Sequence, residues 1–331
     1  MYKTITADLF NSIDDLELFV AHIDPDSYLA RVSLEYLVIN GKSDLLEKLM
    51  EKLLMSSNEE SREWAEVYLI DHLVYKQEKD IIDVTKQLTY KRVQSKELST
   101  LIKVFQLYNY YDMKNFEMRT SLGELVKVEI PNLQDGFMKT SLLCRQKLIM
   151  QAIHLHQNEL EQSRACGKEL LEIALTPLMK AIAYNNLGNS YILSDRKQAL
   201  KHFEASIQIA QLIQHTRILT QAQMNRNFTL CYWNESEKVN LNLDYETRMD
   251  EKLELVFYLI KKNQREKALV VLDEVKAGIG NDYVHGFEQY YRGLATGEHL
   301  YFQKSSKYFE LAGDYYFQQL PLEQLNNGGR R

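Results

Sequence analysis

The chain has 331 residues, of which 45% are hydrophobic, and its formal net charge at pH 7 is −6. This supply of apolar side chains excludes a disordered chain, and the small numbers of glycine (13) and proline (4) favour long helices over a turn-rich β architecture. The acidic balance argues against nonspecific binding of nucleic acid by the whole chain. No apolar run approaches the ~20 residues of a membrane span, and no signal peptide is visible.

The cysteine pattern agrees with a cytoplasmic protein. Cys144, Cys166 and Cys231 are odd in number and widely spaced, and each lies within an apolar helical pattern. This arrangement predicts buried free thiols in a reducing compartment rather than disulfides. We therefore expect a cytoplasmic protein.

Residues 1–125 predict a first region of helical hairpins. Asp26 or Ser27 is the expected cap of a helix over 28–38, because both side chains can accept backbone N–H groups. Further helices are expected over 43–55, 62–75, 78–88, 95–110 and 114–125. Val126–Asn132 (V-K-V-E-I-P-N) alternates like a strand, but a lone strand has no pairing partner. We therefore expect an extended linker over 126–135.

Residues 136–325 predict a second region of helical hairpins, followed by a tail over 326–331. Helices are expected over 142–156, 159–175, 177–193, 196–213, 215–233, 245–261, 265–277, 282–296 and 300–317.

The clearest repeat signal lies between Ala181 and Ala210. Gly188 costs about 1 kcal/mol against alanine in a helix, so its presence predicts close approach of another helix. The small–aromatic–small spacing of Ala199, Phe203 and Ser206 matches such a notch and is close to the tetratricopeptide consensus. Related triplets recur at Cys166/Leu170/Ile173, Ala268/Leu272/Val275 and Ser305/Phe309/Ala312. The pattern predicts an all-α fold, an α-solenoid of tetratricopeptide-like helical hairpins.

Motifs for catalysis or metal binding are absent from the sequence. His154 and His156 are two residues apart, so they point about 200° apart around a helix and cannot face one metal ion. Gly278-Ile279-Gly280 follows a helix instead of opening one, which favours a helix stop over a phosphate loop. There is no serine elbow and no zinc spacing. We expect no enzyme, no metal and no cofactor.

Amide side chains on the predicted inner helices are the better candidates for a binding site. Asn185 and Asn189 are four residues apart and share one helix face, and Gln223 and Asn227 repeat this spacing before Phe228. An amide offers both a donor and an acceptor, which suits it to clamp the backbone of an extended peptide. The alternative is that these amides bond neighbouring helices to one another.

Aromatic residues crowd the C-terminal hairpins, where packing between repeats is the simplest explanation. Tyr290 lies three residues before Gly293, as Asn185 lies three residues before Gly188, which places Tyr290 toward the concave groove that such a solenoid forms and in which a peptide is expected to bind. Asp314, expected on the last helix, could pair with a basic residue of a ligand; as an exposed helix carboxylate it would carry no role.

The chain resembles the AimR family, the arbitrium peptide receptors of Bacillus phages within the wider Rap and PlcR group of quorum-sensing regulators. Short segments carry this resemblance, and their order and spacing along the chain make it specific. They include Ala30-Arg31-x-x-Leu34-Glu35-Tyr36, Ser57-Asn58-x-x-Ser61-x-Glu63-Trp64, Gly188 with Ser190, Phe228 with Trp233, Lys267-Ala268-x-x-x-Leu272, Ser305-Ser306-x-Tyr308-Phe309 and Leu320-Pro321-Leu322.

The resemblance implies a helical solenoid that binds a secreted peptide of about six residues, and dimers that bind DNA through an N-terminal helix-turn-helix. Here it begins at the solenoid, so we expect DNA contact only through a helix-turn-helix that residues 1–331 lack. By position, the family's peptide contacts fall on Asn189, Phe228, Asp314 and Tyr316. Ala152 and His156 stand where the best-known receptors have asparagines, and Leu178 where one has arginine, so a different peptide is expected.

These observations predict an intracellular receptor for a short communication peptide that controls lysis–lysogeny transcription. Its predicted site comprises Asn185, Asn189, Gln223, Asn227, Phe228, Tyr290, Asp314 and Tyr316. A homodimer is a possible assembly. The alternative is a Rap-like or generic tetratricopeptide adaptor that binds a protein partner without touching DNA.

Overall fold

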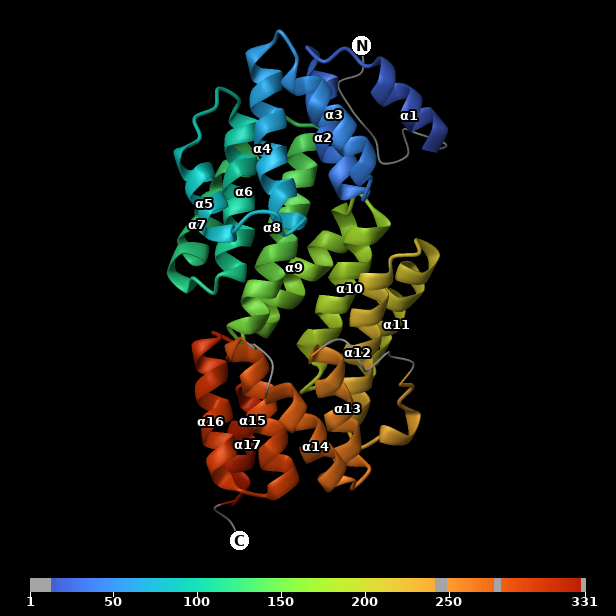
Figure 1. Ribbon diagram of the computed structural model, residues 1–331, viewed down its shortest axis with the longest axis vertical. Coiled ribbons are helices and arrows are strands. Elements are labelled where there is room, and N and C mark those ends of the chain that lie inside the picture. The colour runs from blue at the N-terminus through green and yellow to red at the C-terminus, as the bar shows by residue number, and fades with distance from the viewer. Residues whose placement is uncertain (1–12, 242–248, 277–280, 329–331) are drawn as a thin grey trace. The chain divides into compact units, whose positions relative to one another are not determined.

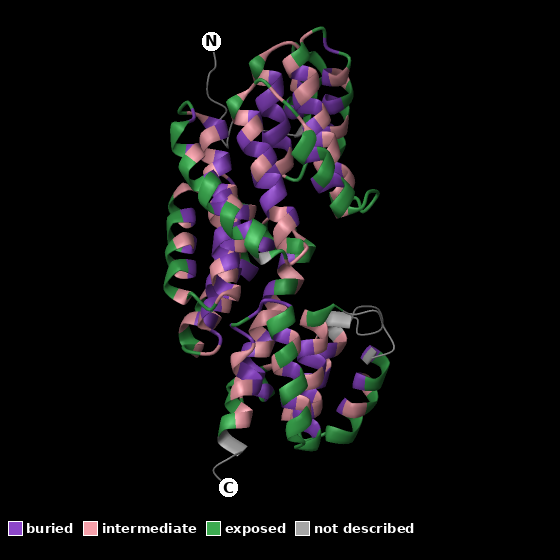
Figure 2. Ribbon diagram, turned by 90° about the vertical axis from the view of Figure 1, so that its left-hand side faces the viewer, coloured by how far each residue is buried: buried purple, intermediate pink, exposed green. Residues whose placement is uncertain are grey.

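The structure is a computed structural model that describes residues 13–241, 249–276 and 281–328. Within these ranges the regular structure is entirely helical, with seventeen α-helices and two short 3-10 helices (Figure 1). The predicted all-α class is therefore confirmed. Consecutive helices pack against one another in pairs, and most helices bury one side and expose the other (Figure 2).

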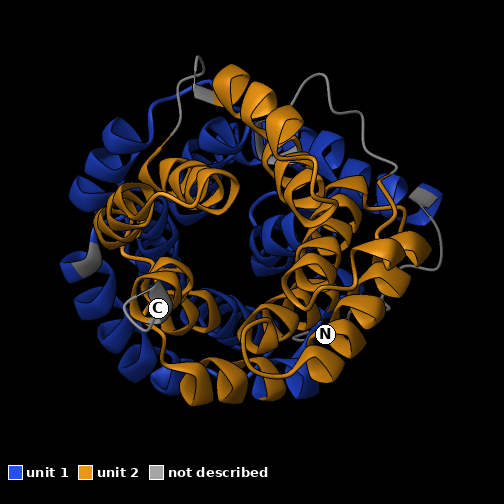
Figure 3. Cartoon of the chain, turned by 90° about the horizontal axis from the view of Figure 1, so that it is seen from below, with its two compact units in different colours: residues 1–150, 169–180 blue, residues 151–168, 181–331 orange. Residues whose placement is uncertain are grey.

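The chain divides into two compact units, coloured separately in Figure 3. Unit 1 comprises residues 1–150 and 169–180, and unit 2 comprises residues 151–168 and 181–331. The division between them does not fall at the linker predicted over 126–135.

Unit 1 begins with seven helices. They are α1 (Ile13–His22), α2 (Tyr28–Ile39), α3 (Ser43–Leu54), α4 (Glu59–Tyr75), α5 (Ile81–Tyr90), α6 (Lys96–Asp112) and α7 (Phe116–Glu129). Ser27 caps α2, as predicted, and accepts a hydrogen bond from the Ala30 N–H at 3.1 Å. In the core, Glu35 is fully buried and accepts a hydrogen bond from Tyr68 Oη at 2.8 Å and from Arg145 Nε at 2.7 Å.

The expectation of an extended linker at Val126–Asn132 is wrong. Helix α7 continues to Glu129, and the 3-10 helix η1 covers Ile130–Asn132. The alternation that resembled a strand reflects burial instead, because Val126 and Ile130 are both buried and lie four residues apart on one helical face. Pro131 fits η1 because it occupies an early helical position, where no N–H is needed.

Three helices follow η1, namely α8 (Phe137–His156), α9 (Leu160–Ile173) and α10 (Pro177–Tyr191). The remaining elements belong to unit 2. They are α11 (Arg196–Leu212), α12 (Thr216–Tyr232), η2 (Ser236–Lys238), α13 (Met249–Lys261), α14 (Arg265–Lys276), α15 (Asp282–Thr296), α16 (His299–Leu311) and α17 (Gln319–Gly328).

The glycine notch predicted at Gly188 is confirmed in unit 2. A Cβ atom built on Gly188 would lie 2.5 Å from Cε1 of Phe203, so only glycine lets α10 and α11 come this close. Ser206 Oγ donates a hydrogen bond to the Ala181 carbonyl at 2.8 Å across the same pair of helices. Helices α15 and α16 repeat the device, with Gly293 against Phe302 and Gly286 against Phe309.

The helix predicted over 300–317 is shorter than expected. Helix α16 ends at Leu311, Gly313 adopts a left-handed φ of 62°, and a separate helix α17 begins at Gln319. Glycine accepts positive φ without steric cost, so it ends the helix here. Asp314 therefore lies in the turn between α16 and α17 (residues 312–318), and its predicted placement on the last helix is wrong.

Candidate ligand-binding site

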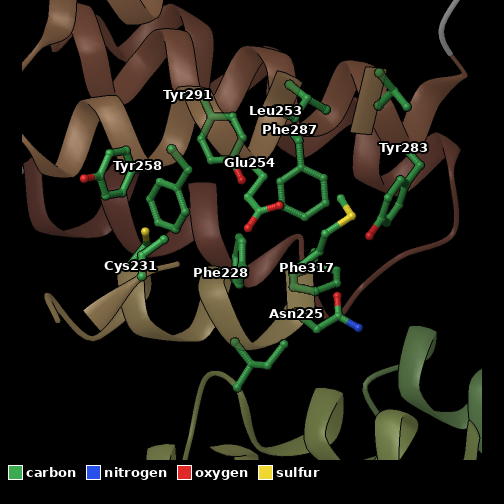
Figure 4. Close-up of a pocket in the computed structure, with 15 residues that line it drawn as sticks. Asn225, Phe228, Cys231, Leu253, Glu254, Tyr258, Tyr283, Phe287, Tyr291 and Phe317 are labelled. Carbon is green, nitrogen blue, oxygen red and sulfur yellow. The ribbon is translucent and has the colours of Figure 1, made fainter. Parts of the chain in front are cut away.

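Unit 2 contains a cavity of about 130 Å³ whose walls are mostly apolar, and seven of its fifteen lining residues are aromatic (Figure 4). Helices α12, α13 and α15 supply most of the lining, Ile192 and Val239 also line the cavity, and one residue comes from the α16–α17 turn. The aromatic lining residues are Phe228, Phe257, Tyr258, Tyr283, Phe287, Tyr291 and Phe317.

The rings pack at distances typical of stable aromatic clusters. The centroids of Phe228 and Phe257 are 5.1 Å apart, and Phe287 and Phe317 are also 5.1 Å apart with planes inclined at 63°. Such arrangements contribute about 0.5–1.5 kcal/mol per pair beyond the burial of area. The cavity walls are therefore held firmly and offer an apolar surface.

The size of the cavity limits what can enter it. A dry engineered cavity of roughly 150 Å³ binds benzene. At about 130 Å³, this cavity can hold one aromatic or branched aliphatic side chain, and the remainder of a longer ligand must lie outside it.

Among the described lining residues, Glu254 is the only one that carries a charge. It is 8% exposed, and its carboxylate lies among the rings in Figure 4. Asn227 Nδ2 donates to Glu254 Oε1 at 2.8 Å and to the Asn240 carbonyl at 3.0 Å, so it links the carboxylate to the segment after η2. A carboxylate between apolar walls interacts strongly with a cation because little water screens it.

The predicted amides stand directly behind the cavity wall. Phe228 forms part of the wall itself. Asn185 is 2% exposed and accepts a hydrogen bond at 3.0 Å from Nδ2 of Asn225, which lines the cavity. Asn227 is equally buried and holds Glu254. Both amides bond neighbouring helices, which is the arrangement expected from the alternative interpretation.

The C-terminal candidates are also buried behind the wall. Asp314 is fully buried and accepts a hydrogen bond at 2.8 Å from the N–H of Phe317, a lining residue. Tyr316, next to Phe317, is 1% exposed, and burial raises its pKa. Tyr290 packs against the lining residue Tyr291 with ring centroids 5.6 Å apart, so it supports the wall.

The remaining two candidates are less constrained by the protein. Asn189 is half-buried, and its Oδ1 atom is enclosed without a hydrogen-bond partner in the described part of the chain. Gln223 is half-buried on α12, next to the lining residue Met224. Neither residue lines the cavity.

Sequence reasoning missed Asn225, Glu254 and most of the aromatic wall. Glu254 stands three residues before Phe257, so both lie on one side of α13. An acidic residue on an otherwise apolar helix face was the signal that could have identified it.

The groups expected to be inert are engaged in ordinary contacts. His154 Nδ1 lies 2.6 Å from Glu159 Oε2, and all three cysteines are free thiols, with Cys144 and Cys231 buried. The described ranges contain no group of three or more His, Cys, Asp or Glu side chains placed to bind a metal ion. None of their helices has the length and apolar composition needed to cross a bilayer. Gly278-Ile279-Gly280 lies outside the described residues.

Comparison with known proteins gives consistent relatives over almost the whole chain. The AimR transcriptional regulator of Bacillus phage phi3T is 29% identical over 316 residues, which cover 95% of this chain and 81% of that protein. The AimR transcriptional regulator of Bacillus phage SPbeta is 24% identical, with 94% and 79% of the two chains covered. A structure of phAimR with a ligand superposes with a TM-score of 0.85 at 26% identity and covers 95% of this chain and 92% of that one.

The family model described as "AimR transcriptional regulator-like" matches residues 13–327. The family consists of transcriptional regulators and not of enzymes, in agreement with the absence of catalytic motifs. The chain belongs to the AimR transcriptional regulator-like family.

Proposed function

We propose that this chain is an intracellular receptor for a short peptide and that peptide occupancy controls phage lysis–lysogeny transcription. The observation that carries the proposal is the aromatic cavity of unit 2 with one carboxylate in its wall. Membership of the AimR family and similarity to a ligand-bound AimR structure support it.

The cavity suits one apolar side chain of the peptide and a cationic group beside it. Burying a phenylalanine- or leucine-sized side chain contributes about 1.5–3 kcal/mol. The cation pairs with Glu254, which Asn227 holds in place. The remaining residues of a peptide of about six residues lie outside a space of this size.

The amides then have two kinds of role. Asn185 and Asn227 position the lining residues Asn225 and Glu254 and do not clamp the peptide directly. Asn189 and Gln223 stay the candidates for contact with the peptide backbone, because both are half-buried and no hydrogen bond of either amide to another described side chain holds it in the wall. Homodimer formation and DNA contact through a helix-turn-helix stay predictions from the family resemblance.

Affinity selection from a pooled hexapeptide library, followed by calorimetry, tests the proposal. We expect the selected peptides to contain an apolar residue and an arginine or lysine. Glu254→Gln keeps an acceptor for Asn227 and removes the charge, so it should weaken binding by at least about 2 kcal/mol, or roughly 30-fold.

Glu298→Gln is the matched control, because Glu298 is exposed on the same unit and should leave affinity unchanged. The proposal fails if no hexapeptide binds, or if the peptides bind equally well to Glu254→Gln. In the first case an adaptor for a protein partner becomes the better explanation of the fold.

A further inference from the structure

The α16–α17 turn is attached to α10 by an unusual contact. Tyr316 Oη donates a hydrogen bond to the Asn189 carbonyl at 2.8 Å and accepts one from the Leu193 N–H at 3.1 Å. Residues 189 and 193 are four apart, so these two backbone groups would bond directly to each other if the α-helix continued. The hydroxyl of Tyr316 takes the place of that bond and ends the helix.

A second contact attaches the same turn to the end of α8. The N–H of Tyr315 donates a hydrogen bond to the His156 carbonyl at 2.8 Å. His156 Nε2 also lies 3.7 Å from Asp314 Oδ2, while Asp314 Oδ1 accepts from the Phe317 N–H within the turn. Consecutive residues of one turn therefore engage the C-terminal ends of two helices in unit 2.

The next residue, Phe317, belongs to the cavity wall. Its ring centroid lies 5.1 Å from that of Phe287 and 5.8 Å from that of Phe228. Phe317 directly follows Tyr315 and Tyr316, which contact α8 and α10, so a displacement that breaks those two contacts would also move Phe317. We call the turn seated when Tyr315 and Tyr316 make these contacts with α8 and α10. In the seated state Phe317 completes the cavity wall.

We propose that seating of the α16–α17 turn and occupancy of the cavity are coupled. A ligand that packs against Phe317 binds the seated state more tightly and so increases its population. Loosening the turn weakens binding by the factor by which it lowers the fraction of protein in the seated state. The inference rests on the proposed function, since it makes this turn the element that senses the peptide. It assigns Tyr316 to holding the turn and not to contacting the peptide.

Hydrogen exchange of the Tyr315 amide tests this coupling with benzene as the probe. Benzene fits a cavity of this size, and at ten times its Kd it should slow the exchange of an amide released only in the unseated state about tenfold. Tyr316→Phe removes one hydroxyl and should speed exchange of the Tyr315 amide about fivefold. Tyr315→Phe is the matched control, because it removes the hydroxyl of a side chain that is 42% exposed and should leave the rate unchanged.

The amide of Phe257, in the core of α13, serves as the reference for general unfolding. The coupling is refuted if benzene binds without slowing Tyr315, or if Tyr316→Phe changes Tyr315 and Phe257 by the same factor. Because benzene needs only the cavity, a failure of hexapeptides to bind would refute the proposed receptor function and leave this result standing. If peptides bind while benzene leaves the exchange rate of the Tyr315 amide unchanged, the proposed receptor function stands and the coupling is refuted.

Discussion

Substituting Gly188 by alanine tests the helix packing on which unit 2 depends. The new Cβ would lie 2.5, 2.6 and 2.8 Å from three ring atoms of Phe203, which is fully buried. Overpacking of this kind costs about 1–3 kcal/mol. Alanine regains up to about 1 kcal/mol of helix propensity over glycine. Since three ring atoms clash and Phe203 is fully buried, we expect a net loss of about 1–2 kcal/mol.

Urea unfolding followed by circular dichroism measures this loss. Phe203→Leu replaces the ring with a smaller side chain that leaves room for the new Cβ. The double variant Gly188→Ala/Phe203→Leu should therefore be more stable than the sum of the two single effects predicts. If Gly188→Ala is neutral or stabilising, α10 and α11 do not approach as closely as the structure indicates, and the tetratricopeptide-like assignment of this hairpin is wrong.

Three further outcomes are expected in other parts of the chain. Glu35→Gln should destabilise unit 1 by about 3–5 kcal/mol in urea unfolding, because it leaves the buried guanidinium of Arg145 without its counter-charge. Burial raises the pKa of Asp71 from 3.8 to about 6, so the folded state holds this proton more tightly. Stability from this group is present below about pH 4, and about 2–3 kcal/mol of it is lost as pH rises through about 6; Asp71→Asn should remove that loss from the pH profile. Burial also raises the pKa of Cys231 to about 12, so a thiol reagent at pH 8 should label Cys166 first, as mass spectrometry would show.

The helices could be predicted from the sequence because their signals are local. Ser27 and Gly188 each fix a feature through neighbours within a few residues or through the adjacent helix. The errors came from signals that depend on tertiary context. Val126–Asn132 alternates like a strand until the burial of Val126 and Ile130 against other helices is known. Gly313 was overlooked as a helix end because aromatic residues continue on both sides of it.

Of the predicted site residues, only Phe228 lines the cavity, and Asn185, Asn227, Asp314, Tyr316 and Tyr290 contact residues that line it. Asn185 and Asn227 can be identified from the sequence because polar residues are unusual at these helix positions. In the structure they form hydrogen bonds with the side chains of Asn225 and Glu254, which line the cavity. The aromatic wall itself resembles ordinary packing in sequence. Phe317 reaches it only through the α16–α17 turn, whose contacts span more than a hundred residues.

Intermolecular nuclear Overhauser effects give the most direct test of peptide binding at the aromatic cavity. Methyl-labelled protein is mixed with a hexapeptide selected for binding, and contacts to the methyl groups of Met224, Val239 and Leu253 are recorded. We expect contacts from one apolar side chain of the peptide to these methyl groups. Tight binding with contacts only to methyl groups of unit 1 would contradict it.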